Sequence, residues 1–199
     1  MERFARGAEG PQALAARGGS VSRRHLLKLG SVIAGTALVP GAALAALRVP
    51  YPPERALKFY NLHTGESLST VYCENGRYVD GALTQINYIL RDFRANEIKP
   101  IDPRLLDLLY SLNRRLYTPE PFAIISGYRS AATNAMLAAR SEGVARRSLH
   151  IEGKAADIRV PGRSLLEVWR AAIDQWSGGV GFYPRSDFVH VDVGRVRFW

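Results

Sequence analysis

Residues 148–160 read SLHIEGKAADIRV and contain one histidine, His150, and one aspartate, Asp157. The whole chain has only four histidines, so a histidine seven positions before an aspartate is a notable feature. The stretch predicts two short strands joined by a turn at Gly153, because glycine readily adopts the positive φ that a tight reversal needs. This strand–turn–strand unit is the starting point for predicting the rest of the fold.

The reversal at Gly153 bears directly on metal binding. Donor atoms lie about 2 Å from a bound zinc ion, so His150 and Asp157 must come close together to share one. Seven residues span roughly 10 Å along a helix, and they span roughly 23 Å along a straight strand. Only a chain that folds back between the two residues brings them to one ion. The spacing and the glycine therefore support each other.

A third candidate ligand lies in DFVHVDVG, residues 187–194. Strand alternation places His190 and Asp192 on one face and Val189 and Val191 on the other, and the valines are typical of a core face. Two histidines, one aspartate and a water would form an open, catalytic zinc site. The alternative is that both histidines only form hydrogen bonds in the core. The residues by themselves leave both interpretations open.

Charge and cysteine content limit the function classes. The 199-residue chain has a net charge of +9, but its basic residues form no run in the body of the chain and no helical stripe. A nucleic-acid binder would need such clustering, so no nucleic-acid partner is predicted. The single cysteine, Cys73, can form no internal disulfide. Any metal site must therefore use His, Asp or Glu.

The N-terminal region has the pattern of an export signal. SRRHLLK, residues 22–28, precedes the apolar stretch LGSVIAGTALVPGAALAA. An arginine pair, here Arg23 and Arg24, before such a stretch is typical of a twin-arginine signal peptide. Ala43 and Ala45 are small residues of the kind that a signal peptidase reads, which predicts cleavage after Ala45.

A retained membrane anchor is the alternative to a cleaved signal. The apolar run of about 17 residues is short of the roughly 20 that a spanning helix needs, and Pro40 interrupts it. We therefore expect export by the twin-arginine translocase to the periplasm, with no stable membrane insertion after cleavage. Residues 1–45 carry six Arg or Lys and two Glu, which leaves a net charge of +5 on residues 46–199. A mildly basic mature chain suits an anionic cell wall.

The mature chain predicts a linker at 46–56 and one domain at 57–199. Strands and helices follow each other without regular alternation, which favours an α+β fold with a central, mostly antiparallel sheet flanked by helices. The zinc site is then expected in a surface groove. In the last helix, Leu166, Trp169 and Ile173 are predicted to face the core. The pattern predicts a hairpin at 57–76, strands at 122–125, 178–184 and 187–194, and helices that begin at 80, 102, 131 and 162.

Several separated segments resemble one known family. They are SGYRS (126–130), TN (133–134), GVARRSLHIEGKAADI (143–158), GGVGFY (178–183) and FVHVDVGRVRFW (188–199). The chain resembles the murein endopeptidase K type of zinc peptidase, which belongs with the D-alanyl-D-alanine metallopeptidases. The family pattern Ser-x-His-x-x-Gly-x-Ala-x-Asp is present here, and a later histidine completes the family's site. The resemblance covers most of residues 57–199.

The resemblance implies a Zn²⁺ ion held by His150, Asp157 and His190, and a substrate in peptidoglycan. It also implies that Arg129 lies near the scissile bond, where it would bind a substrate carboxylate or stabilise the oxyanion. Ser148 would either form a hydrogen bond with the substrate or hold the turn that carries the histidine. The implied activity is hydrolysis of peptide cross-links in cell-wall remodelling. A D,D-carboxypeptidase and a non-catalytic wall-binding module are the alternatives.

Two aspartates are candidates for the general base. Asp187 lies three residues before His190, where relatives of this type carry Glu or His. Strand parity turns Asp187 away from His190 unless a bend precedes Phe188. Asp192 shares the face of His190, but it can instead orient that histidine. We predict Asp187 as the base and keep Asp192 as the alternative.

Overall fold

The computed structural model describes residues 53–141 and 143–199. The predicted signal peptide, residues 1–45, and most of the predicted linker lie outside the described residues. The first strand begins at Glu54, so the ordered domain starts three residues earlier than the predicted boundary at 57. Among the described residues, no helix is both long enough and apolar enough to cross a membrane.

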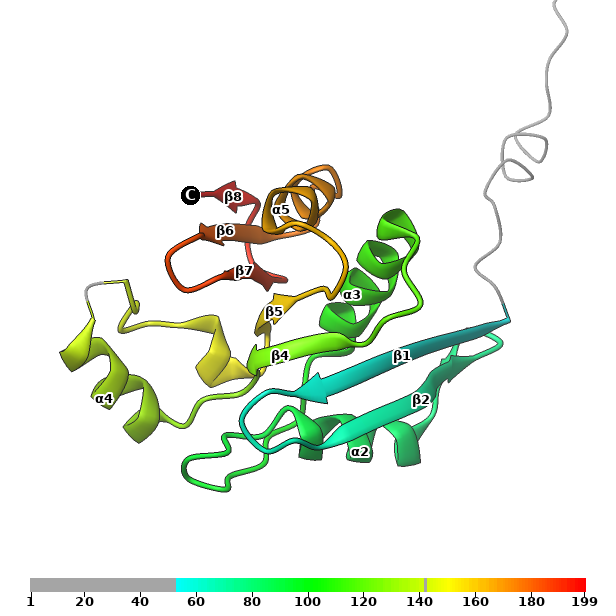
Figure 1. Cartoon of the computed structure of the whole chain (residues 1–199). Helices are drawn as coiled ribbons and strands as arrows, with labels where there is room; N and C mark the ends of the chain where they lie inside the picture. Colours follow the sequence, from blue (N-terminus) through cyan, green and yellow to red (C-terminus); the bar gives the residue numbers. More distant parts are fainter. Residues whose placement is uncertain (1–52, 142) are drawn as a thin grey trace, which may run out of the picture. The chain divides into compact units, whose positions relative to one another are not determined.

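One eight-stranded sheet organises the domain, with the strand order β3-β2-β1-β4-β5-β7-β6-β8 (Figure 1). Neighbouring strands are antiparallel except in the pairs β1–β4 and β6–β8. The predicted α+β fold with a mostly antiparallel sheet is therefore confirmed. The strands are β1 (Glu54–Asn61), β2 (Ser67–Glu74), β3 (Arg77–Tyr78), β4 (Phe122–Ser126), β5 (Ala155–Arg159), β6 (Gly179–Tyr183), β7 (Phe188–Asp192) and β8 (Arg197–Phe198).

Four of the five helices in the described residues begin at a residue whose side chain caps them, whereas the helix that starts at Asp80 has no side-chain cap. Asp102 accepts a hydrogen bond from the backbone of Arg104 at 3.0 Å, and Pro103 follows as the first helical residue. Ser164 and Glu167 form a capping box at the start of the last helix. The helices are α2 (Asp80–Ile89), α3 (Pro103–Leu116), α4 (Ala131–Arg140), the one-turn 3₁₀ helix η1 (Leu149–Glu152) and α5 (Leu165–Ile173).

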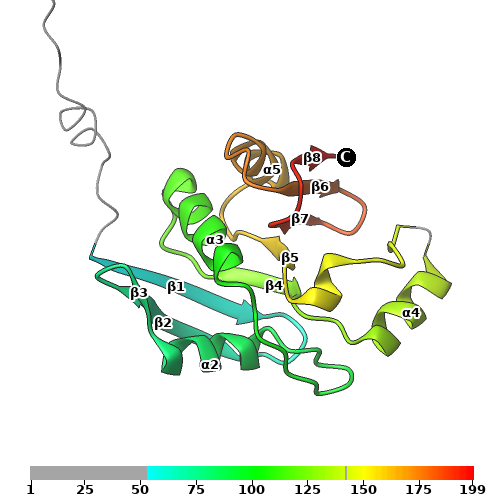
Figure 2. The same cartoon turned by 180° about the vertical axis from the view of Figure 1, so that it is seen from behind.

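The core lies on one face of the sheet. Every second residue of β1 is buried, which leaves the other face of that strand exposed. Helix α2 packs against β2, α3 against β1, and α5 against β6 and β7 (Figure 2). In α5 the buried residues are Val168 and Ala172, whereas Leu166 is 42% exposed. The predicted core face of α5 is thus wrong at Leu166.

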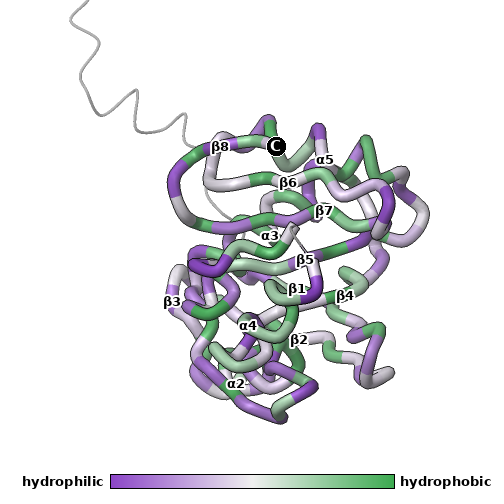
Figure 3. The backbone as a smooth tube through the Cα atoms, turned by 90° about the vertical axis from the view of Figure 1, so that its left-hand side faces the viewer, coloured by the Kyte–Doolittle hydropathy of each residue, from purple (hydrophilic) through white to green (hydrophobic). Residues whose placement is uncertain are grey.

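The opposite face of β5 and β7 carries polar side chains. Ile158 and Val189 are fully buried in the core, so their strand neighbours Asp157 and His190 project from the other side of the sheet. Helix α4 lies beyond one end of the sheet, away from α3 and α5, in both views (Figures 1 and 2). The turn between β6 and β7 is strongly hydrophilic (Figure 3).

Candidate metal centre

A short helical turn, rather than the predicted strand, carries His150. Ser148 caps η1, and its hydroxyl accepts a hydrogen bond from the backbone of His150 at 3.4 Å. Gly153 ends the turn with φ of 68°, and a Cβ at this position would lie 2.4 Å from the carbonyl oxygen of Pro100. Only glycine fits this reversal, as the sequence predicted. The strand assignment was wrong because four residues are too few to show a periodicity.

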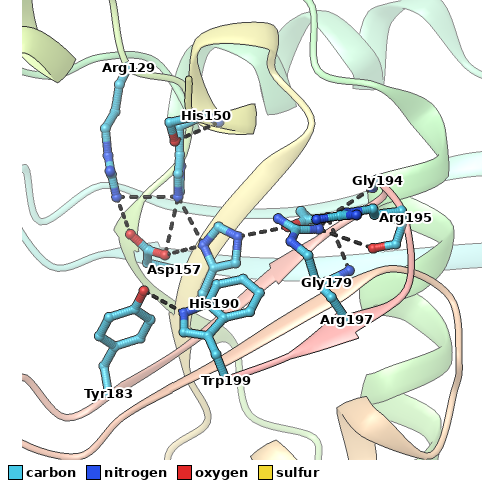
Figure 4. Close-up of polar contacts among 12 residues, drawn as sticks. Arg129, His150, Asp157, Gly179, Tyr183, His190, Gly194, Arg195, Arg197 and Trp199 are labelled. Carbon is cyan, nitrogen blue, oxygen red and sulfur yellow. Dashed lines mark hydrogen bonds and ion pairs between the residues drawn. The ribbon is translucent and has the colours of Figure 1, made fainter. Parts of the chain in front are cut away.

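Register in the sheet brings the other two residues together. Asp157 of β5 lies directly opposite His190 of β7. Cross-strand partners in an antiparallel pair have Cβ atoms about 4.5–5.5 Å apart, so their side chains can touch. Oδ1 of Asp157 lies 2.8 Å from Nδ1 of His190 and 3.2 Å from Nε2 of His150. The predicted convergence of the three side chains is therefore present in the structure (Figure 4).

Backbone and carboxylate acceptors fix the tautomers of both rings. Nδ1 of His150 lies 2.6 Å from the carbonyl oxygen of Gly127, which can only accept, so this nitrogen carries the proton. Nε2 of His190 lies 3.0 Å from Oδ2 of Asp192 and likewise donates. In the neutral rings, Nε2 of His150 and Nδ1 of His190 then present lone pairs to each other at 3.2 Å.

This donor set fits a divalent metal ion. A tetrahedral ion with ligands at about 2.0 Å separates its donor atoms by about 3.3 Å, close to the 2.8–3.2 Å separations found here. Two lone pairs and a carboxylate oxygen face one another, and the hydrogen-bond donor beside them is Nη2 of Arg129, 3.2 Å from Nε2 of His150. Each histidine is also held by an acceptor on its other nitrogen, as metal-binding histidines commonly are. The three residues are therefore a candidate metal centre.

The electrostatics of the cluster favour a cation. Burial lowers the pKa of His150, which keeps its ring neutral. Burial also opposes charge on His190, but hydrogen bonds to Asp157 and Asp192 outweigh it and raise the pKa of His190. Burial alone would raise the pKa of Asp157, yet the two histidines hold it far below its usual range. A cation near His190 and Asp157 is thus stabilised.

Arg129 lies beside this cluster. Its guanidinium forms an ion pair with Oδ2 of Asp157, and its Nε donates to Ser126 at 2.7 Å. Its backbone nitrogen donates to the carbonyl oxygen of His150 at 3.2 Å. Arg129 and Ser148 both line the groove that contains the three candidate ligands. Ser148 therefore holds the turn and also faces the groove.

Asp192 is buried and fully engaged. Its Oδ1 accepts hydrogen bonds from the backbone of Gly179 and Gly194 at 3.1 and 2.8 Å. Its Oδ2 accepts from His190 and, at 2.7 Å, from Arg197. Burial acts to raise the pKa of Asp192, but these hydrogen bonds hold it well below its usual value. Asp192 is thus placed to orient His190.

The structure does not bring Asp187 to the cluster. Asp187 has φ of 52°, so the chain bends just before Phe188. The bend directs the carboxylate to Arg159 at 3.1 Å, and Asp187 does not line the groove of the three ligands. The bend that the prediction required is present, but it leads away from His190. The geometry therefore does not support Asp187 as the base.

Sequence reasoning missed an aromatic wall beside the cluster. The indole of Trp199 lies 5.4 Å from the ring of His190, and its Nε1 donates to the hydroxyl of Tyr183 at 2.8 Å (Figure 4). A Cβ on Gly181 would lie 2.6 Å from the indole, so a glycine on β6 makes room for it. Alternating glycines in GGVGFY were the available signal, but the sequence could not show what fills the space.

An α+β domain with this buried His–Asp–His group in a groove has the features of a metallohydrolase. The family model described as peptidoglycan L,D-endopeptidase MepK matches residues 50–199, and the chain belongs to this family. Murein endopeptidase function, which the sequence resemblance implied, is supported by this membership.

Curated relatives agree with the family assignment. The chain is 47% identical over 178 residues to peptidoglycan L,D-endopeptidase MepK of Escherichia coli (strain K12), which covers 89% of this chain and 97% of the relative. It is 40% identical over 179 residues to the probable peptidoglycan L,D-endopeptidase MepK of Haemophilus influenzae, which covers 89% and 95%. The crystal structure of Serratia marcescens L-Ala D-Glu endopeptidase ChiX matches 56% of this chain and 86% of its own, with 18% identity and a TM-score of 0.35. That structural likeness is too weak to support an argument.

Proposed function

We propose that this protein is a zinc-dependent endopeptidase of the periplasm that cuts amide cross-links between L- and D-configured centres in peptidoglycan. The observation that carries this proposal is the convergence of His150, Asp157 and His190 with both histidine tautomers fixed from outside. The family supports the peptidoglycan substrate. The complete set of donor atoms disfavours a non-catalytic wall-binding module.

In the proposed hydrolysis, a bound metal ion and the side chains around it would have different roles. Zinc, when bound by His150, Asp157 and His190, would supply Lewis acidity that activates a water and polarises the scissile carbonyl. Asp192 acts through His190, because its Oδ2 holds Nε2 and so keeps Nδ1 directed at the cluster. Arg129 donates from a fixed position, since Ser126 and Asp157 hold its guanidinium.

Arg129 is proposed to stabilise negative charge during hydrolysis. A guanidinium at the edge of a buried cluster can bind the developing oxyanion or a substrate carboxylate. Its side chain is 11% exposed, so water competes only weakly with a bound anion. Loss of this charge would raise the barrier to hydrolysis without removing any of the three candidate ligands.

The two aspartates, Asp187 and Asp192, differ in how readily each could accept a proton. Asp192 is buried, and its carboxylate accepts hydrogen bonds from four residues. It therefore cannot take up a proton from water without losing some of these contacts. Asp187 is open to water, but its carboxylate pairs with Arg159. We expect Asp187→Asn to lower kcat less than tenfold, measured on purified peptidoglycan. A loss of a hundredfold or more would establish Asp187 as the base, as the sequence predicted.

The first test combines metal analysis with product analysis. The purified protein and its His150→Ala variant are assayed for bound metal and then incubated with purified peptidoglycan, with products followed by mass spectrometry. We expect about one zinc per chain and release of cross-linked peptides as monomers, with both lost in the variant. Removal of only a terminal D-residue would indicate a carboxypeptidase. A folded protein without zinc or new products would overturn the proposal in favour of a wall-binding module.

A further inference from the structure

A second arginine faces the groove from a different segment. Arg94 lies in the connection between α2 and α3, and it lines the same groove as Arg129 and His150. This connection lies toward the end of the domain that carries α4 in both views (Figures 1 and 2). Residues far apart in the sequence therefore place four guanidinium groups along one groove, those of Arg94, Arg129, Arg147 and Arg197.

The loop that carries Arg94 is tied down by its own backbone. Asp92 and Glu97 exchange two backbone hydrogen bonds of 2.9 and 3.2 Å, which close the loop. The buried carboxylate of Asp92 accepts from the backbone of Arg94 at 3.0 Å and from the backbone of Ser130 at 2.9 Å. The second contact fixes the loop to the start of α4. The backbone of Arg94 is thus held in place relative to the groove.

An aromatic stack orients the side chain of Arg94. Its guanidinium carbon lies 4.2 Å from the centre of the Phe93 ring, and the ring of His63 stacks on Phe93 at 4.2 Å and 15°. Two groups this close cannot share one face, so Phe93 is sandwiched between them. Nε2 of His63 lies 3.0 Å from the carbonyl oxygen of Ile125, which fixes the stack to β4. His63 is therefore part of this support.

Among the described residues Arg94 forms no ion pair, in contrast to Arg91 three residues earlier. Arg91 donates to both carboxylate oxygens of Glu66, at 2.8 and 3.1 Å. Within the described residues, the contacts of the Arg94 guanidinium are the face of Phe93 and the more distant charge of Asp92. Partial burial and the charge of Arg129 lower the pKa of Arg94. An anion bound beside Arg94 would offset both the cost of burying its charge and the repulsion from Arg129.

The charge balance of the groove favours an anionic ligand. Among the described lining residues, Asp157 is the only acid. It is paired with Arg129, and Arg197 is paired with Asp192, whereas Arg147, which also lines the groove, forms no ion pair within the described residues. The groove therefore has a net positive charge, to which Arg94 contributes from a fixed position. Like charges that face one groove repel each other until a ligand of opposite sign enters.

We propose that Arg94 is a specificity-determining residue that binds a free carboxylate of the peptide substrate in the groove that contains the three candidate ligands. Guanidinium groups pair with carboxylates through two parallel hydrogen bonds, and a guanidinium already held in place loses little conformational entropy on binding. The inference rests on the proposed function and adds which substrates are preferred. A peptide with its carboxylate masked as an amide should be a poor substrate.

The test uses two synthetic cross-linked peptides that differ only in this group, a carboxylate in one and a primary carboxamide in the other. For the wild-type protein, amidation should lower kcat/KM at least about tenfold, equivalent to about 1.4 kcal/mol. Arg94→Ala should lower kcat/KM for the carboxylate peptide by a similar factor, mainly through KM, and should leave the amide peptide almost unchanged. The effect of amidation should thus largely disappear in the variant.

Controls separate this inference from a general loss of function. Arg114→Ala removes an exposed arginine that does not line the groove, and it should keep the full preference for the carboxylate. Arg94→Lys keeps the charge without the planar fork and should fall between wild type and Arg94→Ala. Unchanged zinc content and thermal unfolding would show that Arg94→Ala is folded.

The possible outcomes are distinct. An equal loss on both peptides in Arg94→Ala, or no loss on either, would overturn the role of Arg94 while the proposed function stands. A wild-type protein that cleaves both peptides equally well would do the same. A zinc-loaded wild-type protein that cleaves neither would overturn the proposed function and this inference with it.

Discussion

Two polar clusters of the domain differ in how donors and acceptors are matched. The first, here called the tyrosine cluster, consists of Arg55, Tyr72, Tyr78 and Asp107 and joins β1, β2 and β3 to α3. Asp107 accepts from the hydroxyls of Tyr72 at 2.9 Å and Tyr78 at 2.7 Å and forms an ion pair with Arg55. One cation and one anion balance, and each donor meets an acceptor.

The second, the histidine cluster of His150, Asp157 and His190, also has a charge partner in Arg129, which pairs with Asp157 and lies 3.2 Å from Nε2 of His150, but its inner atoms are not matched as donors and acceptors. Its three inner atoms are all potential acceptors within 4.8 Å of one another. Arg55 and Tyr72 are buried as deeply as the histidine cluster, although Asp107 and Tyr78 are partly exposed, so burial alone does not distinguish the two clusters. The difference lies in the match of donors to acceptors: a matched cluster stabilises the fold, whereas converging lone pairs leave a place for a cation.

The largest expected effect comes from removing the one carboxylate, Asp157, among the three candidate metal ligands. Asp157→Asn replaces a carboxylate oxygen that can bind zinc with a neutral amide of nearly the same shape. We expect zinc content to fall to near zero and peptidoglycan hydrolysis to fall at least ~1,000-fold, because metal-assisted chemistry is lost. Metal analysis and product release measure the two effects. A variant that kept both would break the distinction between the clusters.

A smaller loss is expected at the residue that orients His190. Asp192→Asn weakens the acceptor for Nε2 of His190 and the ion pair with Arg197. Changes of this kind typically cost about 10–100-fold in metal affinity, and competition with a chelator measures it. Zinc affinity equal to that of the wild type would show that Asp192 serves only the fold.

The matching change in the tyrosine cluster should affect stability alone. Asp107→Ala leaves Arg55 and two tyrosine hydroxyls without their shared acceptor. We expect a loss of about 2–4 kcal/mol in the free energy of unfolding, as for other broken, partly buried ion pairs. Urea denaturation measures it, with the exposed Asp174→Ala as a control that should change little. Loss of zinc from the folded Asp107→Ala variant would contradict the separation of roles.

The smallest effect is a change in stability at alkaline pH. Burial and the hydrogen bond to Asp107 raise the pKa of Tyr78 from 10.0 to about 12. A raised folded-state pKa contributes stability below pH 10, and this contribution is lost as pH rises towards 12. Denaturation at several pH values should show this decline, and it should be weaker in Tyr78→Phe. An identical decline in the variant would assign it to other groups.

Local patterns predicted much of this molecule. The turn at Gly153 and strand alternation around His190 indicated three candidate ligands, because both rules act over a few residues, and the family resemblance implied that they bind one ion. The helix start at Asp102 followed from capping chemistry for the same reason. The linker boundary was misplaced because β1 begins with polar, exposed residues such as Glu54, which resemble a linker.

Contacts between distant segments could not be predicted in this way. The stack of His63 on Phe93 joins residues from separate loops, and neither segment has a pattern that indicates the other. The direction of Asp187 depends on a single φ of 52° and on Arg159 of another strand. Such details are set by packing, so a sequence-based argument reaches the ligands more easily than the groups that surround them.

The position of Trp199 should make metal binding at the histidine cluster detectable by fluorescence. Its indole contacts His190 and donates to Tyr183, while the other two tryptophans, Trp169 and Trp176, contact different aromatic residues. Binding of a metal ion would change the charge on the ring of His190, which lies against the indole of Trp199. The fluorescence emission of the indole would change with it. The natural protein therefore contains a reporter beside its site, with which metal uptake and release can be timed without a label.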